Sequence, residues 1–200
     1  MRSILVATGN RGKVHEIQAL LEGLDLRLLT PADLSLVQQV EENGATYAAN
    51  AALKAVAFTR LSGLLTLADD SGLEVDALDG LPGLRSARFS PLPHATDADR
   101  RRYLLGQLEE KPRPWKAHFH CTVALALPSG EVFFTDGDCP GEIIPVERGD
   151  NGFGYDPIFL LPELGRTMAE LSMAEKNLLS HRARALKAAL PMLRQLVREG

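Results

Sequence analysis

The sequence contains very little cysteine and no long apolar run. Cys121 and Cys139 are the only cysteines in 200 residues, too few for a disulfide-stabilised scaffold or a thiolate metal site. We therefore expect two buried free thiols, because reduced cysteine behaves as a small core residue. No stretch reaches the roughly 18 consecutive apolar residues of a membrane-spanning helix, and residues 1–8 lack a signal-type apolar segment. We expect a cytoplasmic protein that binds no membrane.

Positive charge is not concentrated anywhere in the chain. The 22 basic and 26 acidic residues give a net charge of −4, and the longest basic block is 100–102. This distribution does not indicate nucleic-acid binding, so any bound phosphate should lie in a local pocket. The 45% apolar content suffices for one core, or for two lobes that share one sheet. We expect a single domain over residues 1–200.

Hydrophobic periodicity predicts alternating strands and helices. Apolar residues at helical spacing, or capping residues, predict helices, whereas β-branched and aliphatic runs predict strands. Residues 79–94 are rich in Gly and Pro and predict an ordered loop. The predicted strands are 4–7, 26–29, 64–68, 115–127, 132–135 and 158–161, and the predicted helices are 14–24, 46–62, 96–109 and a long stretch from 172. The strands 115–127 and 132–135, joined by a turn at 128–130, predict a hairpin. The order of elements indicates an α/β chain with a mixed sheet.

A strand, a polar loop with two glycines and a helix follow one another at the start of the chain. The loop reads Thr8-Gly9-Asn10-Arg11-Gly12-Lys13. Backbone N–H groups at a helix start, with a hydroxyl, an amide and an ammonium, can converge on an anion. The segment is a candidate phosphate loop. It lacks the GxxxxGK(S/T) pattern, however, and such strand-to-helix turns also occur without any phosphate.

Two consecutive carboxylates, Asp69 and Asp70, follow the strand predicted at 64–68. Open α/β sheets place ligand-binding groups at such strand ends. Together with Glu41 and Glu42 they supply enough hard oxygen ligands for one Mg²⁺, which binds a few carboxylates and bridges substrate phosphates. The alternative is a solvated Asp-Ser-Gly turn. A phosphate loop elsewhere in the chain favours the metal interpretation.

Glycines alternate with aromatic residues in Gly152-Phe153-Gly154-Tyr155-Asp156. Glycine permits close approach of the backbone, and the rings would form a wall for a flat base. The alternative is that Phe153 and Tyr155 fill the core beside a tight turn. Composition alone does not separate the two.

The C-terminal helical stretch carries Lys176, Ser180, His181 and Arg182. A solvated polar face is the ordinary alternative for such a run. In one straight helix Lys176 and His181 would lie about 140° apart, so they meet one ligand only if the helix breaks. We predict a break near Leu179, with Ser180 as a second N-cap.

Six ordered motifs resemble the non-canonical purine nucleoside triphosphate pyrophosphatase family, also called the Ham1 or inosine triphosphatase family. The resemblance covers nearly the whole chain. Its motifs are Thr8-Gly9-Asn10-x-x-Lys13, Glu42-x-Gly44-x-Thr46-Tyr47-x-x-Asn50-Ala51-x-x-Lys54-Ala55, Ala68-Asp69-Asp70-Ser71-Gly72-Leu73-x-Val75-x-Ala77-Leu78, Leu81-Pro82-Gly83-x-x-Ser86-Ala87-Arg88, Gly152-Phe153-Gly154-Tyr155-Asp156-Pro157 and Glu175-Lys176-Asn177-x-x-Ser180-His181-Arg182.

The resemblance implies a fold, a metal and a role for each motif. The expected fold is an elongated mixed central sheet with helices and two lobes around a substrate cleft, in a homodimer. The loop 8–13 with Lys13 would bind the triphosphate, Asp70 would activate water, and Asp69 and Lys54 would support the site. Glu42 and Asp70 would hold Mg²⁺. Glu41 is an alternative to Glu42 as the metal ligand, and Asp69 and Asp70 could exchange roles. The residues expected to line the nucleoside are Ser71, Phe153, Gly154, Tyr155, Asp156, Lys176, His181 and Arg182.

The implied activity is hydrolysis of dITP, ITP and XTP to the monophosphate and pyrophosphate, which cleanses the nucleotide pool. Two alternatives stay open at this point. One is a Maf-like nucleotide pyrophosphatase with another base preference, which should not carry Ser180-His181-Arg182. The other is a nucleotide sensor without catalysis, which would gain little from carboxylates beside phosphate unless metal is present.

Overall fold

A computed structural model describes residues 2–198, and the chain divides into two units. The first consists of residues up to 70, 121–137 and 182 onward, and the second of 71–120 and 138–181. The chain therefore enters each unit more than once. That the two units act as one domain stays a prediction. No helix within the described residues is long and apolar enough to span a membrane.

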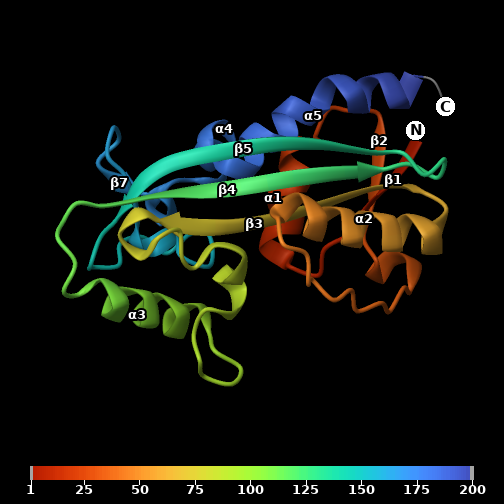
Figure 1. Ribbon diagram of the computed structural model, residues 1–200. Coiled ribbons are helices and arrows are strands. Elements are labelled where there is room, and N and C mark those ends of the chain that lie inside the picture. Colours follow the sequence, from red (N-terminus) through yellow and green to blue (C-terminus); the bar gives the residue numbers. More distant parts are fainter. Residues whose placement is uncertain (1, 199–200) are drawn as a thin grey trace. The chain divides into compact units, whose positions relative to one another are not determined.

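Helices and strands alternate in the first half of the chain, as predicted, whereas the strands between residues 115 and 167 follow one another with no α-helix between them among the described residues (Figure 1). Long helices carry recognisable caps: Thr46 and Thr96 each accept a hydrogen bond from a backbone N–H in the first turn, and Gly63 ends a helix at positive φ. The strands are β1 (Arg2–Val6), β2 (Leu26–Leu29), β3 (Leu65–Val75), β4 (Trp115–Ala126), β5 (Val132–Ile143), β6 (Phe159–Leu161) and β7 (Arg166–Thr167), and the helices are α1 (Arg11–Leu20), α2 (Tyr47–Ser62), α3 (Asp97–Leu108), α4 (Met173–Leu179) and α5 (His181–Arg198).

Within residues 2–198 the strands form one seven-stranded sheet in the order β2-β1-β3-β4-β5-β6-β7. β1 pairs in parallel with β2 and β3, whereas β6 pairs antiparallel with β5 and β7. The predicted mixed sheet is therefore confirmed. β4 and β5 form the predicted hairpin, closed by a hydrogen bond from Leu127 N to Glu131 O at 2.9 Å.

The end of the strand that carries the acidic pair was predicted wrongly, and the strand predicted at 132–135 also extends further, to Ile143. We expected the strand at 64–68 to end before Asp69, with an alternative of a solvated turn. Instead β3 continues through both aspartates to Val75. Leu73 and Val75 are completely buried, and their burial outweighs the local preference of Asp-Ser-Gly for a turn. Residues 79–94 also contain a short 3₁₀ helix at Gly83–Arg88, where only loop was predicted.

In the first unit, side chains of the sheet alternate between two apolar clusters. Ile4 packs with Ile17 of α1 and Leu186 of α5. Leu5, the next residue of β1, packs with α2 at Ala55. Because consecutive strand residues point to opposite faces, α1 and α5 cover one face of this part of the sheet and α2 covers the other.

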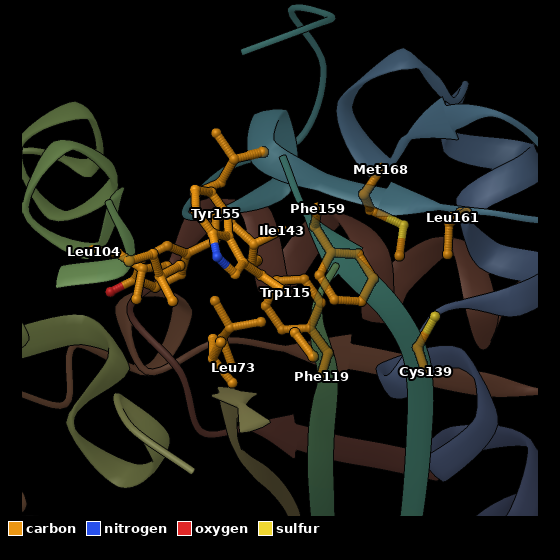
Figure 2. Packing of buried hydrophobic residues seen from close by; sticks show 14 of the residues in the cluster. Leu73, Leu104, Trp115, Phe119, Cys139, Ile143, Tyr155, Phe159, Leu161 and Met168 are labelled. Atoms are coloured by element: carbon orange, nitrogen blue, oxygen red, sulfur yellow. The ribbon is translucent and has the colours of Figure 1, made fainter. Parts of the chain in front are cut away.

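The second unit has a core of its own, rich in aromatic residues. Figure 2 shows Trp115, Phe119, Tyr155 and Phe159 within this cluster, and the Phe119 and Phe159 ring centroids are 4.5 Å apart. Cys139 lies in the same cluster. Both cysteines are buried and are thiols outside any disulfide among the described residues, as predicted.

Glycine 141 on β5 provides a test of this packing. A Cβ at this position would lie 2.5 Å from Leu160 O and 2.5 Å from the Phe159 ring, whereas a Cβ at Gly106 in α3 would meet nothing within 4 Å. Gly141→Ala should destabilise the protein by roughly 1–3 kcal/mol through overpacking. The matched variant Gly106→Ala should stabilise it by roughly 0.5–1 kcal/mol, because alanine favours helix. Urea denaturation measures both, and equal effects would contradict this packing.

Candidate functional site

The loop after β1 begins α1 with a side-chain cap. Asn10 Oδ1 accepts a hydrogen bond from Lys13 N at 3.1 Å, and Thr8 Oγ1 accepts one from Asn10 N at 3.2 Å. Gly9, Asn10 and Arg11 are exposed, and Gly12 is partly buried. The predicted succession of strand, loop and helix is confirmed. The start of α1 therefore presents free backbone N–H groups at the positive end of a helix dipole.

Asp69 lies in a buried network of four charges within the first unit. Its Oδ2 is 2.9 Å from Lys13 Nζ and 3.1 Å from Arg182 Nε. Arg182 also forms an ion pair with Glu16 of α1. Asp69, Arg182 and Glu16 are each only 1% exposed. Two cations and two carboxylates thus balance one another where water cannot screen them.

Burial and charge act in opposite directions on Asp69. Burial alone would raise the pKa of its carboxyl, but Lys13 and Arg182 more than offset this, so the pKa lies well below its ordinary value. The Asp69 side chain is therefore ionised. Its Oδ1 is buried and accepts no hydrogen bond within the described residues. Asp69 is held as an anion and has one spare acceptor.

Asp70 has a different environment. Asn50 Nδ2 donates a hydrogen bond to its Oδ2 at 3.0 Å, and Lys54 Nζ lies 3.8 Å from its Oδ1. Burial raises the pKa of Asp70, and Lys54 and Asn50 offset this only in part. Asp70 is thus the more basic of the two aspartates, which a proton acceptor requires. Ser71, the next residue of β3, is partly exposed.

Lys54 connects two of the predicted metal ligands. Its Nζ is 3.0 Å from Glu42 Oε1 as well as 3.8 Å from Asp70 Oδ1. Glu41, by contrast, is exposed. No three His, Cys, Asp or Glu side chains are placed to hold a metal within the part of the chain that the structure describes. Two carboxylates nevertheless suit Mg²⁺, which keeps waters and takes further oxygens from substrate phosphates.

The aromatic segment of the second unit is fixed by Asp156. Its Oδ2 accepts a hydrogen bond from Phe153 N at 2.9 Å and lies 2.5 Å from Lys176 Nζ. A Cβ at Gly152 would lie 2.1 Å from this oxygen, and Gly152 has φ +76°, so the carboxylate occupies space that only glycine leaves free. Lys176 Nζ lies 4.9 Å from the centroid of the Phe153 ring, close enough for a cation–π contact.

The predicted helix break is confirmed. α4 ends at Leu179, Ser180 has extended backbone with ψ 157°, and α5 begins at His181. His181 stacks on Phe119 with centroids 4.7 Å apart and an interplanar angle of 14°. Arg182 turns to Glu16 and Asp69. The boundary between the two units falls directly after the break, since His181 belongs to the second unit and Arg182 to the first.

Sequence reasoning assigned no role to two polar residues of this site. Asn50 donates to Asp70 and accepts a hydrogen bond from Gly44 N at 2.8 Å, so it ties the loop after Glu42 to β3. Glu16 is the buried partner of Arg182. A signal existed for Glu16, since it stands beside Ile17 on the apolar stripe of α1 and three residues after Lys13. Asn50 lies in the motif that begins at Glu42, but the sequence does not indicate which residue it would contact.

Because of the buried network, we expect replacement of two different arginines of α5 to reduce the stability of the protein by unequal amounts. Arg182→Met leaves Glu16 and Asp69 buried without their shared cation, which should destabilise the protein by roughly 3–5 kcal/mol. Arg184 is exposed, so Arg184→Met should change stability by about 1 kcal/mol or less. Denaturant unfolding of both variants measures the difference. Similar losses in the two variants would show that the network contributes nothing specific.

Comparison with known proteins places the chain in a family. Residues 4–192 match the Ham1 family. A dITP/XTP pyrophosphatase of Geobacter sulfurreducens is 47% identical over 187 residues, 93% of this chain and 94% of that protein. A dITP/XTP pyrophosphatase of Deinococcus deserti is 49% identical over 187 residues, 94% of this chain and 87% of that protein. The structure of a HAM1 protein from Coxiella burnetii superposes with a TM-score of 0.86 at 39% identity, covering 100% of both chains. This chain therefore belongs to the Ham1 family.

Proposed function

We propose that this protein hydrolyses dITP, ITP and XTP to the nucleoside monophosphate and pyrophosphate, and so removes such purine nucleotides from the nucleotide pool. The observation that carries the proposal is the division of the aspartates on β3. Asp69 is held as an anion by Lys13 and Arg182, whereas Asp70 keeps a raised pKa beside Lys54 and Glu42. Its relatives named as dITP/XTP pyrophosphatases support the same activity.

We assign the triphosphate to the first unit. The start of α1 offers backbone N–H groups, and Lys13 and Lys54 offer ammonium groups, whose charges would neutralise phosphate oxygens. Lys13 already faces Asp69 and Lys54 already faces Glu42, so both ammonium groups are oriented before substrate arrives. Such preorganisation lowers the cost of binding a highly charged ligand.

A divalent metal is generally expected for a nucleotide pyrophosphatase, and we propose Mg²⁺ held by Glu42 and Asp70. When bound there, it would neutralise charge on the phosphates and on the departing pyrophosphate. Glu42 is assigned in preference to Glu41 because it shares Lys54 with Asp70. Asp69 is assigned a supporting role, since Lys13 and Arg182 already occupy its Oδ2.

The proposed reaction is an attack of water on the α-phosphorus. Asp70 accepts a proton from the water, the water oxygen bonds to the α-phosphorus, and the bond from that phosphorus to the bridging oxygen breaks to release pyrophosphate. Asn50 and Lys54 fix the orientation of the Asp70 carboxylate. Positioning and charge neutralisation would supply most of the rate enhancement.

We assign the purine base to the second unit. The Phe153 ring would stack on the base, and Lys176 and His181 would donate hydrogen bonds at the 6-keto group of hypoxanthine or xanthine. Adenine presents a donor there, so a donor left unpaired would cost roughly 1–3 kcal/mol. A contact of Arg182 with substrate stays a prediction. The homodimer and the cytoplasmic location stay part of this proposal.

Product analysis tests the reaction. With Mg²⁺, the protein should convert ITP, dITP and XTP to the monophosphate and pyrophosphate, and turn over ATP, dTTP and UTP at least about tenfold less efficiently. Chelation of the metal should abolish turnover, and added Mg²⁺ should restore it. Preference for dTTP or UTP would instead identify a pyrophosphatase of Maf type. Binding without turnover would identify a sensor, and release of orthophosphate alone would refute attack at the α-phosphorus.

Replacement of Asp70 tests the proton acceptor. Asp70→Asn keeps the shape of the side chain but removes the base, so kcat for ITP should fall by roughly 10²–10⁴. Nucleotide binding, measured by calorimetry, should persist. Asp79→Asn is the control, since Asp79 is exposed and has φ +51°, which asparagine also adopts. Near-normal turnover by Asp70→Asn would refute the assignment.

A further inference from the structure

Helix α3 binds both backbone polar groups of Gly154, its N–H and its carbonyl oxygen. Asp97 Oδ2 accepts a hydrogen bond from Gly154 N at 2.8 Å, and Arg101 Nη1 donates one to Gly154 O at 2.8 Å. Asp97 and Arg101 stand four positions apart, so they lie on one face of α3, one turn from each other.

Both side chains of this contact are themselves fixed. Arg101 Nε and Nη2 bind Glu147 Oε1 and Oε2 at 2.9 and 2.8 Å, in the two-bond geometry that guanidinium and carboxylate favour. The Arg101 side chain is 12% exposed, so this pair is shielded from solvent on the arginine side. Arg100 pairs with Asp97 from the next turn of the helix. Neither Asp97 nor Arg101 would move away from Gly154 without losing a further ion pair.

The fixed peptide stands between the two aromatic residues of the segment. Gly154 has φ +62°, and because glycine adopts positive and negative φ with similar ease, its contacts must select this conformation. On one side, Phe153 lies beneath Lys176. On the other, Tyr155 donates a hydrogen bond from its hydroxyl to Ser86 O at 2.9 Å. The backbone conformation at Gly154 therefore contributes to the direction in which the neighbouring Phe153 ring points.

We propose that Asp97 and Arg101 are positioning residues that hold Phe153 and Gly154 in the conformation that receives the purine base, with Glu147 orienting Arg101. This inference rests on the proposed function, which places the base at Phe153. It assigns α3, an element with no part in the phosphate chemistry, to base selection. The two residues touch the loop and act on the base only through it.

The experiment compares Arg101→Met with Arg102→Met in the full-length protein. Methionine keeps most of the aliphatic stem but removes the bonds to Gly154 O and Glu147. Arg102 is the neighbouring position, its side chain is 78% exposed, and it pairs with Asp99 within the helix. For Arg101→Met, KM for ITP should rise roughly tenfold, kcat should change less than about threefold, and the preference for ITP over ATP should fall about tenfold. Arg102→Met should match the original protein in all three.

Two further measurements separate positioning from a general loss of structure. Inhibition by tripolyphosphate, which carries the phosphates without a base, should keep its Ki within about twofold in Arg101→Met. Amide hydrogen exchange in peptides covering 150–158 should become at least about tenfold faster, with the β1 and β3 peptides unchanged. Arg101→Lys, which can still donate to Gly154 O but cannot form the two-bond pair with Glu147, should give intermediate values.

The outcomes distinguish this inference from the proposed function. If the original protein does not hydrolyse ITP, the proposed function fails. If it does, but Arg101→Met keeps KM and the preference for ITP over ATP within about twofold of the original, the positioning role is refuted. An equal rise in KM for ITP and in Ki for tripolyphosphate would also refute it, because the defect would then extend beyond the base.

Discussion

Two ionisable carboxylates on consecutive residues of one buried strand constrain the rest of the first unit. Consecutive residues of a strand point to opposite faces of the sheet, so Asp69 and Asp70 cannot share one partner in the same way. Asp69 lies with the face covered by α1 and α5, where Lys13 and Arg182 bind it. Asp70 lies with the face covered by α2, where Asn50 and Lys54 reach it. Each face must therefore supply its own polar partners to an otherwise apolar core.

The division of partners gives the two aspartates different chemistry from the same local sequence. An uncompensated carboxylate in the interior would either take up a proton or destabilise the fold by several kcal/mol. Asp69 avoids both because two cations, Lys13 and Arg182, surround it. Glu16 then balances the charge of Arg182, the second of these cations. Asp70 has weaker compensation, and its pKa is raised. The fold thus holds Asp69 ionised at neutral pH beside Asp70, whose pKa is raised.

Local sequence predicted the elements far better than their functional consequences. The helices and their caps were predictable because Thr46, Thr96 and Ser172 satisfy backbone N–H groups through contacts a few residues apart. The break at Ser180 followed from helix geometry together with the assumption that Lys176 and His181 meet one ligand. The length of β3 was not predictable, because the burial of Leu73 and Val75 depends on distant chain segments. Motif resemblance selected residues that the structure brings together, such as Lys13 with Asp69 and Lys54 with Glu42. Nothing in the sequence pairs Arg182 with Glu16.

The same physical arrangement recurs in the second unit. Asp156 and Lys176 form an ion pair whose side chains are each only 4% exposed, and apolar residues of similar size would serve stability there as well or better. The pair instead fixes the orientation of Phe153, because Asp156 accepts a hydrogen bond from Phe153 N and Lys176 overlies the Phe153 ring. The pair of Arg102 with Asp99 has no such consequence, because the Arg102 side chain is 78% exposed and solvent screens its charge. Buried charge in this protein is therefore best understood as fixing the orientation of particular groups, at a cost that an apolar core would not incur.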